Sequence, residues 1–226
     1  MPLLEAVIGW LAPPQCLSCD AEGSMVCESC LSSAILPYGE RCWGCGSMSE
    51  NSRTCQRCRR PGSPAHVWIT TSHEGLAREL LHAYKFEQQR AAASSLAKLM
   101  TTTFTGNDKH QDYLVIPLPT ATKRVRERGF DHASLLARII AQKLELEFRP
   151  VLRRLGQTRQ VGSTRTNRLA QMADEFWVKN PEVVTGRRIL LVDDVITTGA
   201  TIYSASKTMR LAGAVRVDAL VFAKHL

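Results

Sequence analysis

Residues 189–201 read Ile-Leu-Leu-Val-Asp-Asp-Val-Ile-Thr-Thr-Gly-Ala-Thr and contain the clearest chemical pattern in the chain. The apolar residues Ile189–Val192 are typical of a buried parallel strand, and Asp193 and Asp194 follow them directly. A turn rich in Thr and Gly leads into a helical pattern over Ile202–Leu211. A strand, turn and helix in this order place backbone N–H groups at the positive end of a helix, where a phosphate binds well.

The residue types in the turn suit the parts of a sugar phosphate. Gly199 lets the backbone approach an anion closely, and Thr197, Thr198 and Thr201 add hydroxyl donors. The two acids before the turn are placed to hold vicinal sugar hydroxyls or a hydrated Mg²⁺ ion. The alternative is an ordinary turn in which the Asp and Thr residues only cap the helix. Capping requires one such residue, so the full pattern favours sugar-phosphate recognition.

This run closely resembles the phosphoribosyl-pyrophosphate (PRPP) signature of type I phosphoribosyltransferases. The resemblance implies that the paired acids face the ribose, that Mg²⁺ accompanies PRPP, and that the turn cradles the 5′-phosphate. The residues that it assigns to PRPP binding are Asp193, Asp194, Val195, Ile196, Thr197, Thr198, Gly199, Ala200 and Thr201.

A second loop is dense in cations and follows an apolar strand pattern at Tyr113–Leu118. Its candidate ligand residues are Thr122, Lys123, Arg124, Arg126 and Arg128. Cationic side chains after a parallel strand suit a pyrophosphate, and the corresponding loop of type I phosphoribosyltransferases holds the pyrophosphate of PRPP. The alternative is a solvated basic turn.

A longer basic segment spans residues 153–168, which contain five arginines and no acid. By resemblance, this is the flexible loop that closes over PRPP, and Arg159, Arg165 and Arg168 are its candidates for electrostatic stabilisation. The alternatives are an exposed basic loop and a contact with a nucleic-acid backbone. Residues 123–168 hold twelve Lys or Arg and four acids, so the chain's net charge of +8 is concentrated there.

All eight cysteines lie within residues 16–58 as four Cys-x-x-Cys pairs, which are Cys16/Cys19, Cys27/Cys30, Cys42/Cys45 and Cys55/Cys58. Two pairs complete a closed tetrahedral zinc site, so the segment predicts two structural Zn²⁺ ions. We favour sequential grouping, with the first four cysteines on one ion, although a cross-braced arrangement remains open. Four pairs are more than redox chemistry would require.

The basic residues of this arm cluster at Arg53, Arg57, Arg59 and Arg60, so any nucleic-acid contact of the arm is expected in its second half. Scaffolding or docking of a partner is equally consistent with it.

The composition suits one ordinary domain with a small appendage. The chain has 226 residues, of which 44% are hydrophobic. The apolar stretch Leu3–Leu11 is too short to span a membrane and lacks a basic flank, so neither membrane insertion nor export is expected. A reducing cytoplasm then favours metal binding over disulfides. Lone histidines such as His132 are expected on the surface.

After the cysteine arm, strand and helix patterns alternate. Strands are expected at His66–Thr71, Tyr113–Leu118, Ile189–Val192 and Val215–Phe222, and helices at Gly75–Phe86, Ala91–Leu99, Ala133–Leu146 and Ile202–Leu211. This alternation predicts an α/β fold with a mainly parallel sheet flanked by helices, as in type I phosphoribosyltransferases. The expected division is a zinc-binding domain at residues 1–62 and a phosphoribosyltransferase-like domain at residues 63–226, joined near Pro61–Pro64.

Together, the cysteine arm, the segment Arg126–Phe130, the tripeptide Tyr84–Phe86 and the signature resemble the ComF family, also called ComFC/GntX-like proteins. This chain has Asp131-His132 where the family usually shows Asn-Gln. The resemblance implies a PRPP-binding protein of natural competence, DNA uptake or the use of external DNA. PRPP or a related ribose 5-phosphate is then the small ligand, and single-stranded DNA or DNA-uptake proteins are candidate partners. The alternative is an active phosphoribosyltransferase of nucleotide metabolism with an unknown acceptor.

Overall fold

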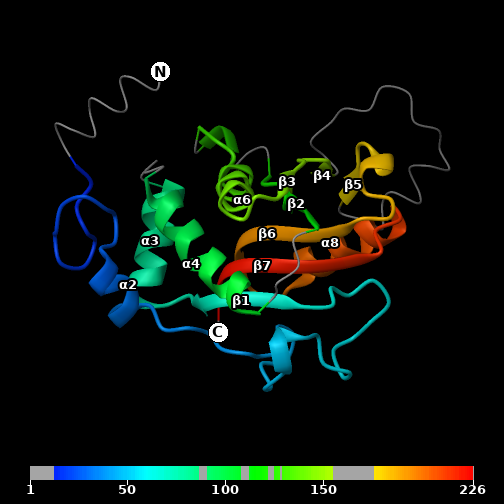
Figure 1. The fold of residues 1–226 in the computed structure, drawn as a ribbon, viewed down its shortest axis with the longest axis horizontal. Coiled ribbons are helices and arrows are strands. Elements are labelled where there is room, and N and C mark those ends of the chain that lie inside the picture. The colour runs from blue at the N-terminus through cyan, green and yellow to red at the C-terminus, as the bar shows by residue number, and fades with distance from the viewer. Residues whose placement is uncertain are drawn as a thin grey trace.

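A five-stranded parallel sheet forms the centre of the molecule (Figure 1). The computed structural model describes residues 13–86, 91–107, 112–121, 125–127, 129–154 and 176–225. The strands lie in the order β1-β7-β6-β2-β3, and each neighbouring pair is parallel. Their bounds are Val67–Ser72 for β1, Tyr113–Pro117 for β2, Glu147–Phe148 for β3, Arg188–Ile196 for β6 and Arg216–Lys224 for β7. This confirms the predicted parallel sheet.

Helices cover both faces of the sheet, so its strands are buried on each side. On one face pack α3 (Gly75–Phe86), α4 (Ala92–Asn107) and α6 (His132–Lys143), and on the other α8 (Ala200–Leu211) (Figure 1). Side chains of β6 alternate between these layers. Leu190 and Val192 join the core under the first three helices, while Ile189 and Leu191 join the core under α8. This double burial explains the continuous apolar run in the sequence.

The strand of the signature is longer than the sequence predicted. We expected the strand to end at Val192, directly before the two acids, but β6 continues to Ile196. The extension is held by β7, since the register runs on to the pair Ile196↔Lys224. Asp193 and Asp194 therefore belong to the strand, where the ladder to β7 fixes their backbone.

The cysteine segment contacts both layers. Met25, Val26 and Leu31 of its first half pack into the core under α3 and α4, whereas Trp43 of its second half packs into the core under α8. The short helix α2 (Glu28–Ala34) and the turn η1 (Glu50–Ser52) belong to this segment.

Some short elements escaped the sequence analysis. Strands β4 (Leu152–Arg154) and β5 (Phe176–Val178) form an antiparallel pair, and η2 (Pro181–Val183) precedes β6. Elements of two or three residues are too short to show a periodic pattern. Among the described residues, no helix has both the length and the apolar character that a membrane crossing requires.

Candidate functional site

The paired acids lie at an open part of the sheet edge. Pairing of β6 with β2 ends at Val192↔Pro117, whereas pairing with β7 continues for the rest of the strand. Asp193 and Asp194 thus project beyond the end of β2, at the carboxyl ends of the strands. Ligands of open parallel sheets bind at this edge, because the loops that follow the strands leave a crevice there.

Each acid has a distinct environment. The Nζ atom of Lys85, in the last turn of α3, lies 2.8 Å from Oδ1 of Asp194, and the two side chains are only 17% and 16% exposed. Oδ1 of Asp193 accepts a hydrogen bond of 2.9 Å from the N–H of Asp194. Burial and the neighbouring charge of Asp194 raise the pKa of Asp193 to about 7, despite the opposing effect of the charges of Lys85 and Arg154. Ionisation of both acids is therefore unfavourable, and a bound cation or hydroxyl donor would stabilise the second negative charge.

This raised pKa gives the protein an expected pH dependence. The pKa of Asp193 is about 7 in the folded protein, whereas its ordinary value, which applies to the unfolded chain, is 3.8. As pH rises, Asp193 therefore loses its proton at a lower pH in the unfolded chain than in the folded protein. The contribution of this group to the free energy of unfolding therefore falls as pH rises between these two values. We expect Asp193→Asn to remove that decline and to exceed wild-type stability at pH 8 by roughly 1–3 kcal/mol. Denaturant unfolding at pH 5 and pH 8, without ligand, measures this, with Glu79→Gln as the control. An unchanged pH dependence in the Asn variant would contradict the assignment.

The turn after β6 has the geometry expected of a phosphate cradle. Gly199 caps the amino end of α8 and has a φ of 77°, in the left-handed region that disfavours side chains. Thr197 and Thr198 are exposed, and the hydroxyl of Thr198 accepts the N–H of Ala200 at 3.4 Å. The structure thus brings the predicted glycine and hydroxyls together at a helix start.

Trp43, from the cysteine segment, lies directly against this turn. A Cβ atom on Gly199 would come within 2.1 Å of the Trp43 ring. Trp43 is itself fixed, because its indole Nε1 donates to the hydroxyl of Thr54 at 2.9 Å and its backbone carbonyl accepts from Nζ of Lys224 at 2.6 Å. Burial lowers the pKa of Lys224 at this position. Gly199 is therefore needed for its φ and for this contact, and no local sequence pattern indicates the contact.

Most of the predicted cationic ligand residues lie outside the residues that the structure describes. Thr122, Lys123, Arg124 and Arg128 lie outside the described residues, as do Arg159, Arg165 and Arg168. Arg126 is described and is exposed. Near the paired acids the described cations are instead Lys85 and Arg154, at the end of β4. The sequence analysis noted Lys85 only as part of a family tripeptide.

The prediction that His132 lies on the surface is wrong, because the structure shows it buried. Its Nε2 lies 3.1 Å from the carbonyl oxygen of Tyr84, and the Tyr84 hydroxyl donates to the His132 carbonyl at 2.7 Å. Asp131 caps α6 by accepting the N–H of Ser134, and it also accepts the hydroxyl of Thr120. His132 therefore ties the end of α3, and with it Lys85, to the start of α6, while Asp131 joins the start of α6 to Thr120.

The eight cysteines form two separate groups of four. In each group the sulfur atoms all lie within 4.8 Å of one another, and the members are Cys16, Cys19, Cys27 and Cys30 in one and Cys42, Cys45, Cys55 and Cys58 in the other. This is the sequential grouping that we favoured. The Sγ–Sγ distances of 3.6 Å for Cys19 and Cys27 and 3.7 Å for Cys45 and Cys55 are close to the edge of a tetrahedron with zinc–sulfur bonds of about 2.3 Å.

In the second group, the pKa values of neighbouring thiols are shifted in opposite directions. A hydrogen bond with the Ser47 hydroxyl is the main cause that lowers the pKa of Cys45 to about 6. Burial and the neighbouring thiols raise the pKa of Cys58 to about 12. Four crowded thiols cannot all ionise without a cation, and a divalent ion with sulfur affinity would remove this conflict. The residues therefore fit a closed structural metal site.

Comparison with known proteins adds sequence relatives along most of the chain. Residues 131–226 match the phosphoribosyl transferase domain family. Competence protein ComFC of Bacillus subtilis (strain 168) is 26% identical over 223 residues, which cover 86% of this chain and 88% of that protein. DNA utilization protein YhgH of Escherichia coli (strain K12) is 25% identical over 206 residues, which cover 85% and 87%. The solved adenine phosphoribosyltransferase of Thermoanaerobacter pseudethanolicus is 20% identical, with 62% of this chain and 83% of that chain covered and a TM-score of 0.38.

The domain match contains the signature and α8, and the two relatives extend the similarity to most of the chain. The parallel sheet flanked by helices and the two cysteine groups agree with this assignment. The chain is therefore similar to the phosphoribosyl transferase domain family over residues 131–226 and to ComF-type competence and DNA utilization proteins along most of its length.

Proposed function

We propose that this protein binds PRPP, or a related ribose 5-phosphate, at the carboxyl ends of β6 and β7. One observation carries the proposal: Asp193 and Asp194 project from an open strand end directly before the Gly199 turn at the start of α8. A pair of acids beside a cluster of N–H donors suits a ligand with vicinal hydroxyls at one end and a phosphate at the other.

In this proposal the turn 197–201 takes the 5′-phosphate through its N–H groups and hydroxyls, and Val195 and Ile196 line the approach. The acids take the ribose hydroxyls, directly or through Mg²⁺. Lys85 holds Asp194 in place at 2.8 Å. Thr122, Lys123, Arg124, Arg126 and Arg128 are proposed for the pyrophosphate, and Arg159, Arg165 and Arg168 for closure over the ligand.

Each cysteine group is proposed to hold one structural Zn²⁺ ion. Four sulfur ligands close the coordination sphere, so the ions would stabilise the arm and take no part in chemistry. We place the boundary between the zinc-binding arm, residues 1–62, and the phosphoribosyltransferase-like domain, residues 63–226, before β1. A reducing cytoplasm is the compartment that suits free cysteines.

The biological role is proposed to be natural competence, or DNA uptake or utilisation. Its support is the names of the relatives, a competence protein and a DNA utilization protein. Single-stranded DNA and DNA-uptake proteins are the candidate partners.

An active phosphoribosyltransferase is the second candidate function, and it is favoured by the domain match over residues 131–226. Catalysis would require this site to hold PRPP in place, to neutralise the leaving pyrophosphate and to exclude water.

Calorimetric titration of PRPP with Mg²⁺ into zinc-replete protein tests the pocket. Asp193→Ala/Asp194→Ala should lower the affinity at least about 100-fold, or about 2.7 kcal/mol, because it removes both ribose contacts. The control variant Glu74→Ala/Glu79→Ala removes the same charge from two exposed positions, one directly before α3 and one within it. It should bind PRPP with the affinity of the wild-type protein. Equal affinity in the two double variants would refute the residue assignment, and a folded wild type without PRPP affinity would refute the function. Release of pyrophosphate only with an added acceptor would identify the enzyme.

A further inference from the structure

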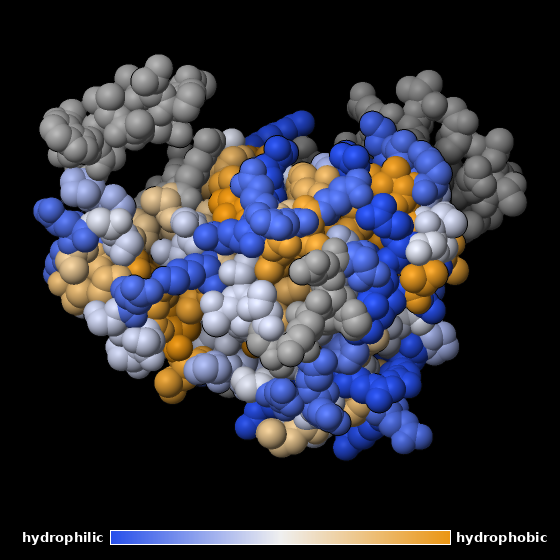
Figure 2. All heavy atoms as spheres, viewed as in Figure 1, coloured by the Kyte–Doolittle hydropathy of each residue, from blue (hydrophilic) through white to orange (hydrophobic). Residues whose placement is uncertain are grey.

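A cavity of about 540 Å³ opens at the amino ends of β1 and β7, opposite to the edge that carries the paired acids. Its lining includes His66 and five arginines, which are Arg53, Arg59, Arg60, Arg210 and Arg216. The surface of this lower part of the molecule, where the second half of the cysteine segment lies, is largely hydrophilic (Figure 2).

The arginines reach the cavity from three separate parts of the fold. Arg53, Arg59 and Arg60 come from the cysteine segment, Arg210 from the last turn of α8, and Arg216 from the first residue of β7. Among the residues that the structure describes, no Asp or Glu lines the cavity. Gathering like charges raises the electrostatic energy of the folded protein, and an anion in the cavity would relieve it.

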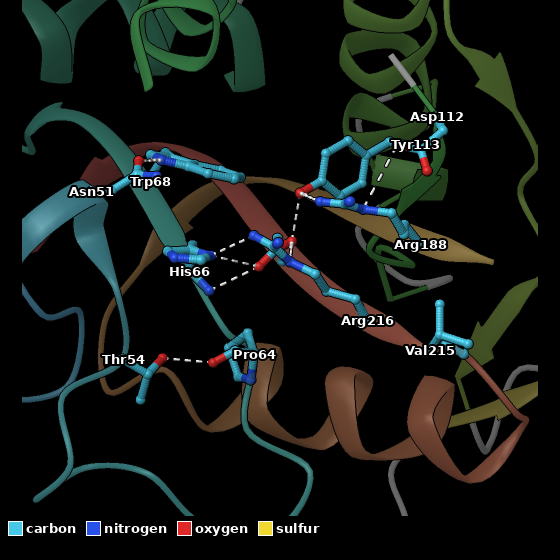
Figure 3. Close-up of polar contacts among 12 residues, drawn as sticks. Asn51, Thr54, Pro64, His66, Trp68, Asp112, Tyr113, Arg188, Val215 and Arg216 are labelled. Atoms are coloured by element: carbon cyan, nitrogen blue, oxygen red, sulfur yellow. Dashed lines mark hydrogen bonds and ion pairs between the residues drawn. The ribbon is translucent and has the colours of Figure 1, made fainter. Parts of the chain in front are cut away.

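One of these arginines is held rigidly by a buried acid. Asp218 is fully buried, and its Oδ2 accepts hydrogen bonds of 2.6 Å from Nε of Arg216 and of 2.6 Å from the Tyr113 hydroxyl (Figure 3). Its Oδ1 accepts the N–H of His66 at 2.9 Å. Nδ1 of His66 lies between Oδ1, at 3.1 Å, and Nη2 of Arg216, at 2.7 Å. The guanidinium of Arg216 is therefore oriented before any ligand arrives.

The arginines of the cysteine segment have no such internal partner. Arg53, Arg59 and Arg60 are exposed, and within the described part of the chain no ion pair joins them to an acid. Arg210 donates through Nη1 to the carbonyls of Ala214 and Val215. The cavity thus combines two arginines fixed by protein groups with three whose guanidinium donors face solvent.

We propose that this cavity is a second anion site, which binds the phosphate groups of a ligand other than the one at the paired acids. Guanidinium groups match phosphate oxygens with pairs of parallel hydrogen bonds, and five of them suit more than one phosphate. A small phosphorylated molecule and the backbone of a nucleic-acid strand share this chemistry. The site goes beyond the proposed PRPP pocket and does not depend on it, since the two lie at opposite ends of the strands.

Paired variants in the zinc-replete full chain test this site. Arg53→Gln/Arg59→Gln removes two exposed cavity residues, and Arg41→Gln/Arg78→Gln removes the same charge from exposed positions outside the cavity. The probes are a fluorescent single-stranded oligodeoxynucleotide, followed by anisotropy over a range of salt, and inorganic phosphate and pyrophosphate, followed by calorimetry. PRPP affinity is measured on every variant and should not change.

We expect the cavity variant to lose about tenfold or more in affinity for at least one probe, while the control stays within about twofold. If the oligonucleotide is the affected probe, the slope of log affinity against log salt should shrink by about 1.4, for two lost phosphate contacts. Loss for phosphate or pyrophosphate alone would identify a small phosphorylated ligand. If no probe binds, or if cavity and control variants lose equal affinity, the site is refuted. If the wild-type protein does not bind PRPP, the comparison of cavity and control variants still tests the second anion site.

Discussion

Replacing Asp218 with Ala should lower the free energy of unfolding by roughly 3–5 kcal/mol, because it leaves a partly buried guanidinium without its counter-charge. The carboxylate is fully buried and accepts from Arg216 of β7, Tyr113 of β2 and His66, which directly precedes β1. Denaturant unfolding of zinc-replete protein measures the change. The matched control is Asp112→Ala, whose exposed carboxylate lies 3.7 Å from Nε of Arg188 and should contribute less than about 1 kcal/mol. Equal effects of the two variants would contradict this reading.

The same carboxylate should set part of the acid sensitivity of the protein. Burial would raise the pKa of Asp218, but hydrogen bonds from His66 and Tyr113 and the charge of Arg216 together lower it. A lowered pKa contributes stability above the ordinary Asp value, and this contribution is lost as pH falls through the folded value. Wild type should therefore lose stability more steeply below about pH 4 than Asp218→Asn does.

Replacing Cys58 with Ser should disrupt the second cysteine group and, with it, the turn at Gly199. Structural zinc contributes about 10–16 kcal/mol to folding of small metal domains, so losing one ligand should release the ion and loosen the segment that presents Trp43. We expect the zinc content to fall from two ions to one and PRPP affinity to fall about tenfold or more. Elemental analysis and calorimetry measure the two effects.

Cys19→Ser in the first group is the matched control. It should also release one ion, but its group packs beside α3 and α4, away from Trp43, so PRPP affinity should change much less. Hydrogen exchange of the turn 197–201 gives a readout that does not depend on PRPP, and it should quicken only in the Cys58 variant. Equal exchange in the two variants would show that the contact between Trp43 and Gly199 does not stabilise the turn.

The sequence predicted the parts of the site that are local in the chain. The strand, acids, turn and helix of the signature lie within residues 188–211, and each cysteine group lies within a short segment. Local patterns of this kind fix their own geometry, since the backbone between the residues has few arrangements. Helix Gly75–Phe86 has the predicted bounds for the same reason.

Contacts between distant segments were out of reach of such patterns. The ion pair of Lys85 with Asp194, the contact of Trp43 with Gly199 and the convergence of Arg53 with Arg216 all join residues that only the folded sheet brings together. Asp218 interrupts an otherwise apolar strand in the sequence, and nothing near it indicates the buried network. The extension of β6 beyond Val192 depends likewise on β7, its neighbour in space.

The position of β7 between β1 and β6 also has a consequence for biosynthesis. Strand β1 ends at Ser72, but its partner in the sheet is β7, which ends at Lys224, far later in the chain. Nascent β1 therefore lacks its partner in the sheet until β7 has emerged, and closing so long a loop makes folding slow. During this interval the cysteine segment is already complete, so metal binding and its bridge from Pro37 to Thr71 of β1 can stabilise it first.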